Sequence, residues 1–342
     1  MSEPDQMYRS GGFEKKQPPD LVHLSAAEAL ELGERSMRRL GYDVEASRIV
    51  AENLVDTALC GYASAGLPRI LNIADNPKHR QPRTAIRVVH ETDTSALIDG
   101  GNNVGLYSVH RATGIAVEKA RRSGFALVGV YNSFYSGRNA DYLEMSAKRD
   151  LVGIHLASGH LQVVPYGGIR PALGTNPIGF GMPSSRGPVI LDMGTAAIMG
   201  ADVILKTRLN ELLPEGVAVD GEGEVTRDPR KAREGGILTF GGHKGYGLSF
   251  CVQALGILAG AALNRDKDYG FLFIVFDPAM IVPVEHFKNE LTALINRIKA
   301  TPRKPGVPEI LIPGERAFRE RERRRVEGIE LDRLVFEKLN AL

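Results

Sequence analysis

The stretch that decides the fold is residues 107–156, YSVHRATGIAVEKARRSGFALVGVYNSFYSGRNADYLEMSAKRDLVGIHL. It begins with a helical pattern over 107–123 and continues into FALVGV (125–130), a short apolar run. A second helix is expected over 141–149, and a second largely apolar run, LVGIHL, follows over 151–156. Strands that are apolar on both faces and alternate with helices are typical of a covered sheet, so the sequence predicts an α/β fold.

The pattern changes on both sides of this centre, which predicts a division into domains. Residues 1–22 are polar and are expected to form a flexible N-terminal arm. A helical domain is expected over residues 23–84, completed by the C-terminal segment 284–342, and an α/β domain over 85–283. The helical domain opens with SAAE at 25–28, the spacing of a capping box at a helix start.

Composition argues against several classes of protein. The 342 residues carry 43 Lys and Arg against 41 Asp and Glu, so no general basic excess points to a nucleic acid partner. The uncharged stretch 246–263 contains several glycines and predicts a buried core helix rather than a membrane span. Cys60 and Cys251, both expected to be buried and inert, are too few for a disulfide framework or a Cys-based zinc site. These features predict a soluble, cytoplasmic protein without nucleic acid, membrane or metal.

The common cofactor and nucleophile motifs are absent: no G-x-G-x-x-G after a strand, G-x-x-x-x-G-K-[ST], H-E-x-x-H or G-x-S-x-G occurs. What remains are junctions rich in glycine and polar residues at predicted strand ends, where α/β proteins bind ligands. They are 132–138 (NSFYSGR), 166–177 (YGGIRPALGTNP), 191–195 (LDMGT), 241–247 (GGHKGYG) and 313–316 (PGER). GGHKGYG could be a plain turn, but its glycines, the following helix start and Lys244 would together favour an anion.

In order and spacing, these junctions resemble the type-2 malate/L-lactate dehydrogenase family, over about residues 24–331. The similarity rests on VYNSxYSG, VPYGGxxPxLGTNPIGF, ILDMGT, LPEGVAVDGEGEVTRDP, GGHKGYGLSF, and ILIPGER with EGIEL. The resemblance implies an NAD(P)-dependent oxidoreductase whose α/β cofactor-binding domain has a mixed sheet and is not of the Rossmann type. It also implies a substrate-side helical N- and C-terminal domain and, usually, a homodimer.

The family pattern also implies which residues contact the cofactor, NAD or NADP. Thr175 and Asn176 would border the nicotinamide, and Ser158 and Gly159 lie where family members touch cofactor or substrate. The remaining cofactor contacts implied are Asp192, Met193, Gly194, Thr195, His243, Lys244, Gly314, Glu315 and Arg316.

The sequence departs from the family pattern at two histidines usually credited with proton transfer. One belongs to a Ser-His-Gly that is followed three residues later by Arg; here Ser64 and Arg69 are present, but Ala65 replaces the histidine. The second corresponds to Tyr135. The resemblance implies that Ser64 and Arg69 bind substrate, and a planar guanidinium binds the carboxylate of a 2-oxo or 2-imino acid bidentately.

Three interpretations of the missing histidines are open. In the first, Tyr135 is the general acid, activated by Arg138 or another cation, with His160 as the residue that could replace the imidazole. In the second, the substrate is an imine, whose nitrogen can arrive already protonated. In the third, the chain has kept the fold and lost the reaction.

The sequence therefore predicts an NAD(P)-dependent oxidoreductase that transfers a hydride to or from C2 of a small 2-oxo or 2-hydroxy acid. The alternatives are a ketimine reductase acting on a cyclic 2-imino acid and, in another class, a non-catalytic family member acting as a binding protein. The expected partners are a small carboxylate substrate and a second copy of the chain. The choice between NAD and NADP stays open.

Overall fold

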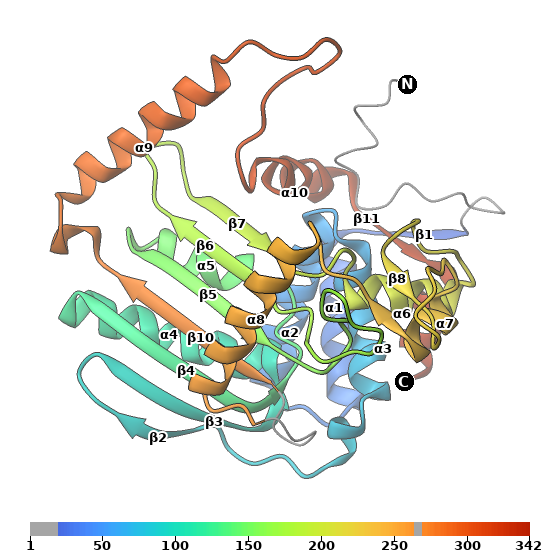
Figure 1. The fold of residues 1–342 in the computed structure, drawn as a ribbon. Helices are drawn as coiled ribbons and strands as arrows, with labels where there is room; N and C mark the ends of the chain where they lie inside the picture. The colour runs from blue at the N-terminus through green and yellow to red at the C-terminus, as the bar shows by residue number, and fades with distance from the viewer. Residues whose placement is uncertain (1–19, 263–268) are drawn as a thin grey trace.

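The centre of the molecule is a seven-stranded sheet in the order β2-β3-β4-β10-β5-β6-β7. A computed structural model describes residues 20–262 and 269–342 (Figure 1). Only β3 and β4 run parallel, and every other neighbouring pair in this sheet is antiparallel, so the sheet is mixed as predicted. Its strands are β2 Arg87–Glu91, β3 Ser95–Val104, β4 Phe125–Phe134, β5 Val152–Ser158, β6 Ile178–Met182, β7 Val189–Met193 and β10 Gly270–Phe276.

Helices cover both faces of the sheet, which explains the apolar runs of its central strands. Alternate residues of β10 pack on opposite sides: Phe271 and Phe273 join a core that includes Val109 of α4, whereas Leu272 joins Val252 of α8. Helices α4 (Gly105–Ser123) and α8 (His243–Leu258) therefore lie on opposite faces. Helix α5 (Ala140–Ala147) packs on β5 and β6.

Helix α8 packs unusually close to the strand beneath it. A Cβ built on Gly256 would lie 2.0 Å from Oγ of Ser158 at the end of β5, so only a glycine allows this approach. The expectation of a buried core helix is wrong for the outward face of α8, where Phe250 is 58% exposed and Leu258 63% exposed. Cys251 is exposed on that face as well, contrary to the prediction, whereas Cys60 is buried as expected.

The two ends of the described chain meet in a small second sheet. Strand β1 (Leu21–Leu24) pairs antiparallel with β11 (Ile329–Asp332). The rest of the predicted arm, residues 1–19, lies outside the described residues. Around this pair lie α1 Ala26–Arg39, α2 Val44–Leu59, α3 Pro68–Asp75, α10 Glu315–Glu327 and α11 Arg333–Ala341. The remaining elements are η2 Ala63–Ala65, η3 Pro77–Arg80, α6 Gly200–Leu209, β8 Ala218–Val219, α7 Pro229–Glu234, β9 Gly236–Ile237, η4 Pro278–Met280 and α9 Val284–Lys299.

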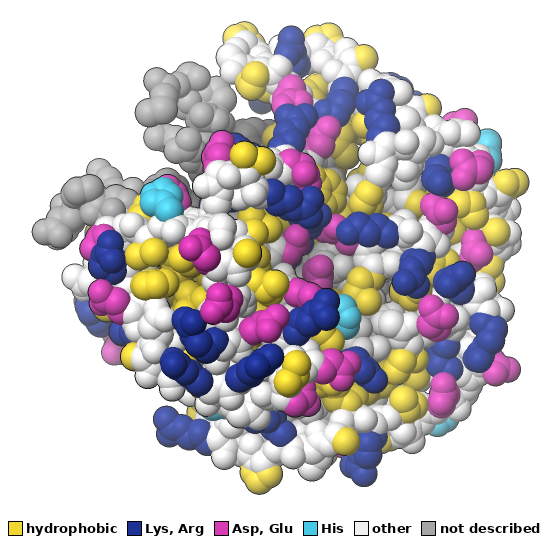
Figure 2. Space-filling model, turned by 180° about the vertical axis from the view of Figure 1, so that it is seen from behind, with side chains coloured by type: hydrophobic (Ala, Val, Ile, Leu, Met, Phe, Trp, Pro, Cys, Tyr) yellow, Lys and Arg dark blue, Asp and Glu magenta, His cyan; other side chains and the backbone are white. Residues whose placement is uncertain are grey.

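The arginine-rich helix α10 is anchored by a buried ion network. Its Arg321 is mostly buried, and Nη2 lies 2.7 Å from Oδ2 of Asp56 on α2 and 2.6 Å from Oε1 of Glu144 on α5. This side of α10 is therefore buried. Its outer side is exposed, and arginines there, such as Arg323, pair with glutamates about one turn away. On the face opposite to Figure 1, basic and acidic side chains are intermingled (Figure 2).

Among the described helices, none has the length and apolar character needed to cross a membrane.

Candidate functional site

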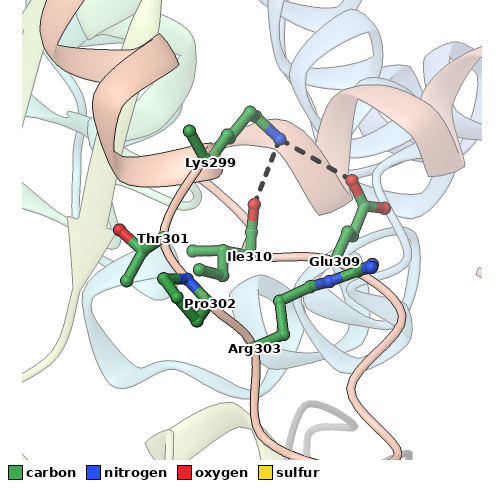
Figure 3. A pocket seen from close by; sticks show the side chains of 7 residues that line it. Lys299, Thr301, Pro302, Arg303, Glu309 and Ile310 are labelled. Atoms are coloured by element: carbon green, nitrogen blue, oxygen red, sulfur yellow. Dashed lines mark hydrogen bonds and ion pairs between the residues drawn. The ribbon is translucent and has the colours of Figure 1, made fainter.

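A cleft of about 1300 Å³ lies between α3, the strand ends of the large sheet, α6 and the start of α10. A smaller hollow of about 420 Å³ lies after α9, where Lys299 contacts Glu309 and the Ile310 carbonyl (Figure 3), and it contains none of the predicted site residues. The large cleft brings together much of the predicted site. The predicted residues that line it are Arg69, Tyr135, Ser158, Gly159, His160, Thr175, Asn176, Asp192, Gly194 and Gly314.

Arg69 presents a cation to the cleft from the first turn of α3, which begins at Pro68. Its Cζ lies 5.0 Å from the centre of the Tyr135 ring. Its Nε is buried and has no hydrogen-bond partner among the described residues. Burial lowers the pKa of Arg69, against the opposing effects of Tyr135 and Asp202. A buried nitrogen of this kind costs free energy until an acceptor reaches it, so the guanidinium is suited to an anionic ligand.

Tyr135 follows β4 in the left-handed backbone region, with φ of 56°, and its ring packs edge-on against Tyr269 at 6.1 Å. The cation beside Tyr135 is Arg69. The expectation that Arg138 activates this tyrosine is not supported, because Arg138 is held elsewhere: its guanidinium lies 3.0 Å from Asp56 and 3.2 Å from Glu144. His160 lines the same cleft and is exposed.

Asp202 is a site residue that the motif pattern did not single out. It lies in the first turn of α6, lines the cleft and accepts a hydrogen bond from the hydroxyl of Ser64. Burial raises the pKa of Asp202, although the Ser64 hydrogen bond and the charges of Lys206 and Arg69 oppose the rise. Ala65 also lines the cleft. The available sequence signal was an acidic residue at the helix start that follows LDMGT.

The glycine-rich junctions are held by specific hydrogen bonds. Asn176, with φ of 39°, donates from Nδ2 to the Ser249 carbonyl at 2.9 Å, while its buried Oδ1 has no partner among the described residues. The amide and hydroxyl of Thr195 both donate to the Thr175 carbonyl, at 3.0 and 3.1 Å, which ties two junctions together. These bonds give the cleft wall a fixed backbone shape.

Two of the strand-end residues that line the cleft also carry structural contacts. Asp192 accepts a hydrogen bond from the Ala140 amide at 2.9 Å, so it caps α5. Burial raises the pKa of Asp192, although this bond opposes the rise. The Ser158 hydroxyl accepts from the Gly270 amide at 3.1 Å. Both residues are therefore fixed at the cleft wall.

Other predicted residues lie outside the cleft lining. His243 and Lys244 are exposed at the start of α8, and the His243 ring lies 6.0 Å from that of Tyr166. Glu315 lies 2.7 Å from Nζ of Lys299. The guanidinium of Arg316 lies 4.9 Å from the Tyr62 ring. Ser64, Met193 and Thr195 also do not line the cleft themselves.

In the described part of the chain, no three or more His, Cys, Asp or Glu side chains are grouped so that they could hold a metal ion.

The sequence and the fold both match known dehydrogenases. L-sulfolactate dehydrogenase from Methanothermobacter thermautotrophicus is 35% identical over 331 residues, which cover 93% of this chain and 95% of that protein. A Delta(1)-pyrroline-2-carboxylate/Delta(1)-piperideine-2-carboxylate reductase from Pseudomonas syringae pv. tomato is 30% identical over 318 residues, 88% of this chain and 91% of that protein. The solved sulfolactate dehydrogenase of Methanocaldococcus jannaschii superimposes with a TM-score of 0.82 at 31% identity, covering 94% of this chain and 96% of that one.

The family model described as malate/L-lactate dehydrogenase matches residues 24–340, almost the whole described chain. The fold, the cleft and these similarities agree with the family resemblance of the sequence motifs. The chain therefore belongs to the malate/L-lactate dehydrogenase family of oxidoreductases.

Proposed function

We propose that this protein transfers a hydride between a nicotinamide cofactor and C2 of a small 2-oxo or 2-hydroxy acid, and that Arg69 binds the substrate carboxylate. The observation that carries the proposal is the buried, unpartnered Nε of Arg69 in the large cleft. A guanidinium satisfies a carboxylate with two parallel hydrogen bonds, and in a low-dielectric site these bonds are strong. Ser64 is proposed to support the substrate at the same end through Asp202, which lines the cleft and accepts the hydrogen bond of the Ser64 hydroxyl.

The cleft fits a nicotinamide dinucleotide in size and in chemistry. Its volume of about 1300 Å³ exceeds the 300–1000 Å³ typical of small-ligand pockets, so it can take a cofactor and a substrate together. Glycines at three junctions line it and let a ligand approach the backbone, and the unpartnered Asn176 Oδ1 borders it. When bound, the nicotinamide would supply or accept the hydride. The residues proposed to hold it are Ser158, Gly159, Thr175, Asn176, Asp192, Met193, Gly194, Thr195, His243, Lys244, Gly314, Glu315 and Arg316.

Tyr135 is the proposed proton donor, with His160 as the second candidate. The proposal rests on the Arg69 guanidinium, which lies 5.0 Å from the centre of the Tyr135 ring in the same cleft, so Tyr135 borders the end where a carboxylate on Arg69 would bind. Asp202 lines the same cleft, and burial raises its pKa. Tyr135→Phe should lower kcat and change its pH profile while the KM for cofactor stays the same. If the variant keeps the wild-type kcat and pH profile, Tyr135 is not the donor.

Reduction of a cyclic 2-imino acid is the second candidate function, and the absence of both family histidines favours it. The sequence motifs assign Ala65 and Tyr135 to those positions, and both residues line the cleft. An iminium nitrogen already carries its proton, so its reduction needs less acid catalysis. The Asp202 carboxylate would stabilise such a cation near Arg69. Turnover of Delta(1)-piperideine-2-carboxylate without turnover of pyruvate would identify this activity.

The first experiment is a titration of the protein with NADH and with NADPH, followed by the fluorescence of the nicotinamide. The chain has no tryptophan, so the protein signal interferes little. We expect saturable binding, and the tighter nucleotide is the cofactor. Absence of binding by both would refute the proposed function.

The matched test of substrate binding is Arg69→Ala, with Arg69→Lys as the conservative variant. Removing the guanidinium should raise KM for the carboxylate substrate by about a hundredfold or abolish turnover, while cofactor binding survives. Lysine keeps the charge and loses the bidentate geometry, so its defect should be intermediate. Unchanged kinetics in Arg69→Ala would contradict the assignment.

We also propose that the protein is a homodimer and that the outward face of α8 contributes to the interface. Phe250, Ile257 and Leu258 are 58%, 46% and 63% exposed on one side of this helix, and clustered apolar exposure of this kind is typical of contact surfaces. Sedimentation should give a dimer that Leu258→Glu weakens. Thiol labelling of the neighbouring Cys251 should slow as protein concentration rises. A wild-type monomer at all concentrations would exclude the interface.

The proposed division of labour follows the sequence-based domains. Residues 23–84 with 284–342 would form the substrate side, carrying Arg69, and 85–283 the cofactor-binding side. Both contribute to the lining of the same cleft.

A further inference from the structure

The end of the cleft beside Arg69 contains a second arginine. Arg69 lines this end from α3, and Arg208 lines it from α6. Burial is the main cause that lowers the pKa of Arg69, and the charge of Arg208 lowers it further, so the two guanidinium groups are within electrostatic reach of each other. Two cations at one end of a cleft would suit a substrate with two anionic groups, provided that both cations were available.

Arg208 is already engaged by the wall of the cleft. Its Nη2 lies 2.6 Å from Oδ2 of Asp75, and its Nη1 donates a hydrogen bond to Oδ1 of Asn72. Both acceptors follow Arg69 on the same helix, α3. The Arg208 side chain is only 13% exposed, whereas the Asp75 side chain is 75% exposed, so the guanidinium is shielded and its acid partner faces solvent.

Arg69 has no such acid partner within the described ranges. Its neighbour is the aromatic ring of Tyr135, and its Nε is unsatisfied. Of the other arginines that line the cleft, Arg138 is held by two carboxylates. Arg233 is exposed on α7 and is not among the leading charges that act on Arg69. Arg69 therefore offers the cleft a guanidinium with an unsatisfied Nε and no directly paired carboxylate, although the charge of Asp202 acts on it.

We propose that this chain selects substrates with a single anionic group, and that Asp75 is the residue that sets this preference by neutralising Arg208. The proposal rests on the proposed function, since it takes Arg69 as the site of the substrate carboxylate. It applies equally to a 2-oxo and a 2-imino monocarboxylate.

The physical reason is the cost of a second buried anion. A second carboxylate or a sulfonate at this end would meet a guanidinium whose charge is compensated, next to the carboxyl groups of Asp75 and Asp202. Binding is strongly disfavoured when an anionic group gives up its hydration shell and gains no unpaired cation in return. Asp75 therefore disfavours a second anion by occupying Arg208.

The test compares substrate preference in three full-length proteins. Steady-state kinetics with cofactor use pyruvate and Delta(1)-piperideine-2-carboxylate as monoanionic substrates and oxaloacetate as the dianionic one. The wild type should show a kcat/KM for one monoanionic substrate at least about tenfold above that for oxaloacetate. Asp75→Asn keeps the shape of the side chain and removes its charge. This variant should raise kcat/KM for oxaloacetate, relative to kcat/KM for the monoanionic substrate, by about tenfold. The change should come from a lower KM for oxaloacetate.

Glu45→Gln is the matched control. Glu45 is also an exposed acid paired with an arginine, Arg111, at 2.7 Å, and neither residue lines the cleft. This variant should leave the substrate ratio unchanged. The proposal is overturned if wild type prefers oxaloacetate, or if Asp75→Asn moves the ratio no further than Glu45→Gln does.

A second test needs neither the Asp75→Asn variant nor turnover: calorimetry measures the binding of lactate and of malate to the wild type. Lactate should bind more tightly than malate, and Arg69→Ala should abolish lactate binding. Tighter binding of malate, or no binding of lactate, overturns the proposal. Failure of the proposed function is recognised separately, by the absence of NADH and NADPH binding in the fluorescence titration.

Discussion

Replacement of Glu144 by glutamine should destabilise the protein substantially, because this carboxylate compensates two buried arginines. Glu144 is 3% exposed and lies 2.6 Å from Arg321 and 3.2 Å from Arg138. Burial alone would raise the pKa of Glu144, but hydrogen bonds and charge from Arg321, with the charge of Arg138, lower it to about 2 from 4.5. Each pKa unit corresponds to about 1.4 kcal/mol, so the ionised carboxylate contributes about 3 kcal/mol. Breaking a buried ion pair costs about 3–5 kcal/mol, which agrees.

The assay is urea unfolding of wild type and Glu144→Gln as a function of pH. A carboxyl group with a lowered pKa stabilises the fold above its unfolded-state pKa, and this contribution is lost as pH falls towards the folded-state value. The difference in free energy of unfolding should therefore be about 3 kcal/mol near pH 7 and should shrink below about pH 4.5.

The control is Glu322→Gln on α10. Glu322 forms an exposed ion pair with Arg325, so this variant should lower the free energy of unfolding by less than about 0.5 kcal/mol. A Glu144→Gln protein as stable as this control, or a difference independent of pH, would refute the reasoning.

Three further predictions concern the packing around the cleft. Gly256→Ala should destabilise the protein by about 1–3 kcal/mol in urea unfolding, because its Cβ would collide with Ser158; Gly247→Ala on the same helix, with open space at its Cβ, should not. Asn176→Ala should lower the free energy of unfolding by about 1–3 kcal/mol, because buried hydrogen bonds are lost. Asn176→Gly loses the same bonds but tolerates the positive φ, so it should be less destabilising. Equal destabilisation by the two variants would show that the backbone conformation at residue 176 contributes no strain. His155, whose pKa burial lowers to about 3, should show no imidazole titration between pH 5 and 8 by NMR, and a midpoint in that range would contradict its burial.

Local patterns predicted most of the fold. FALVGV and LVGIHL lie in the strands β4 and β5, the helix expected over 141–149 is α5, and the capping box at Ser25 and Glu28 starts α1. These elements could be predicted because periodicity and capping depend on residues close together in the chain. The uncharged stretch 246–263 shows the limit, since apolar composition does not reveal whether the outer face of a helix is covered.

Within the site, motif resemblance identified residues that share the cleft but not their partners. Tyr135 and Arg69 were both predicted, yet their contact at 5.0 Å and the diversion of Arg138 to other acids appear only in the folded chain. Asp202 had no recognised motif, and its role depends on a hydrogen bond to Ser64, 138 residues away.

The sequence by itself determined the α/β alternation, the positions of most helices and strands, and the family, because these depend on local spacing and on motifs that survive divergence. Only the tertiary structure decided which charges are compensated. Arg208 pairs with Asp75 and Arg321 pairs with Glu144 and Asp56, whereas the Nε of Arg69 has no hydrogen-bond partner in the described residues. The free energy of a buried charge depends on how deeply it is buried and on which partners the fold brings to it from distant parts of the chain. Neither can be derived from the order of residues alone.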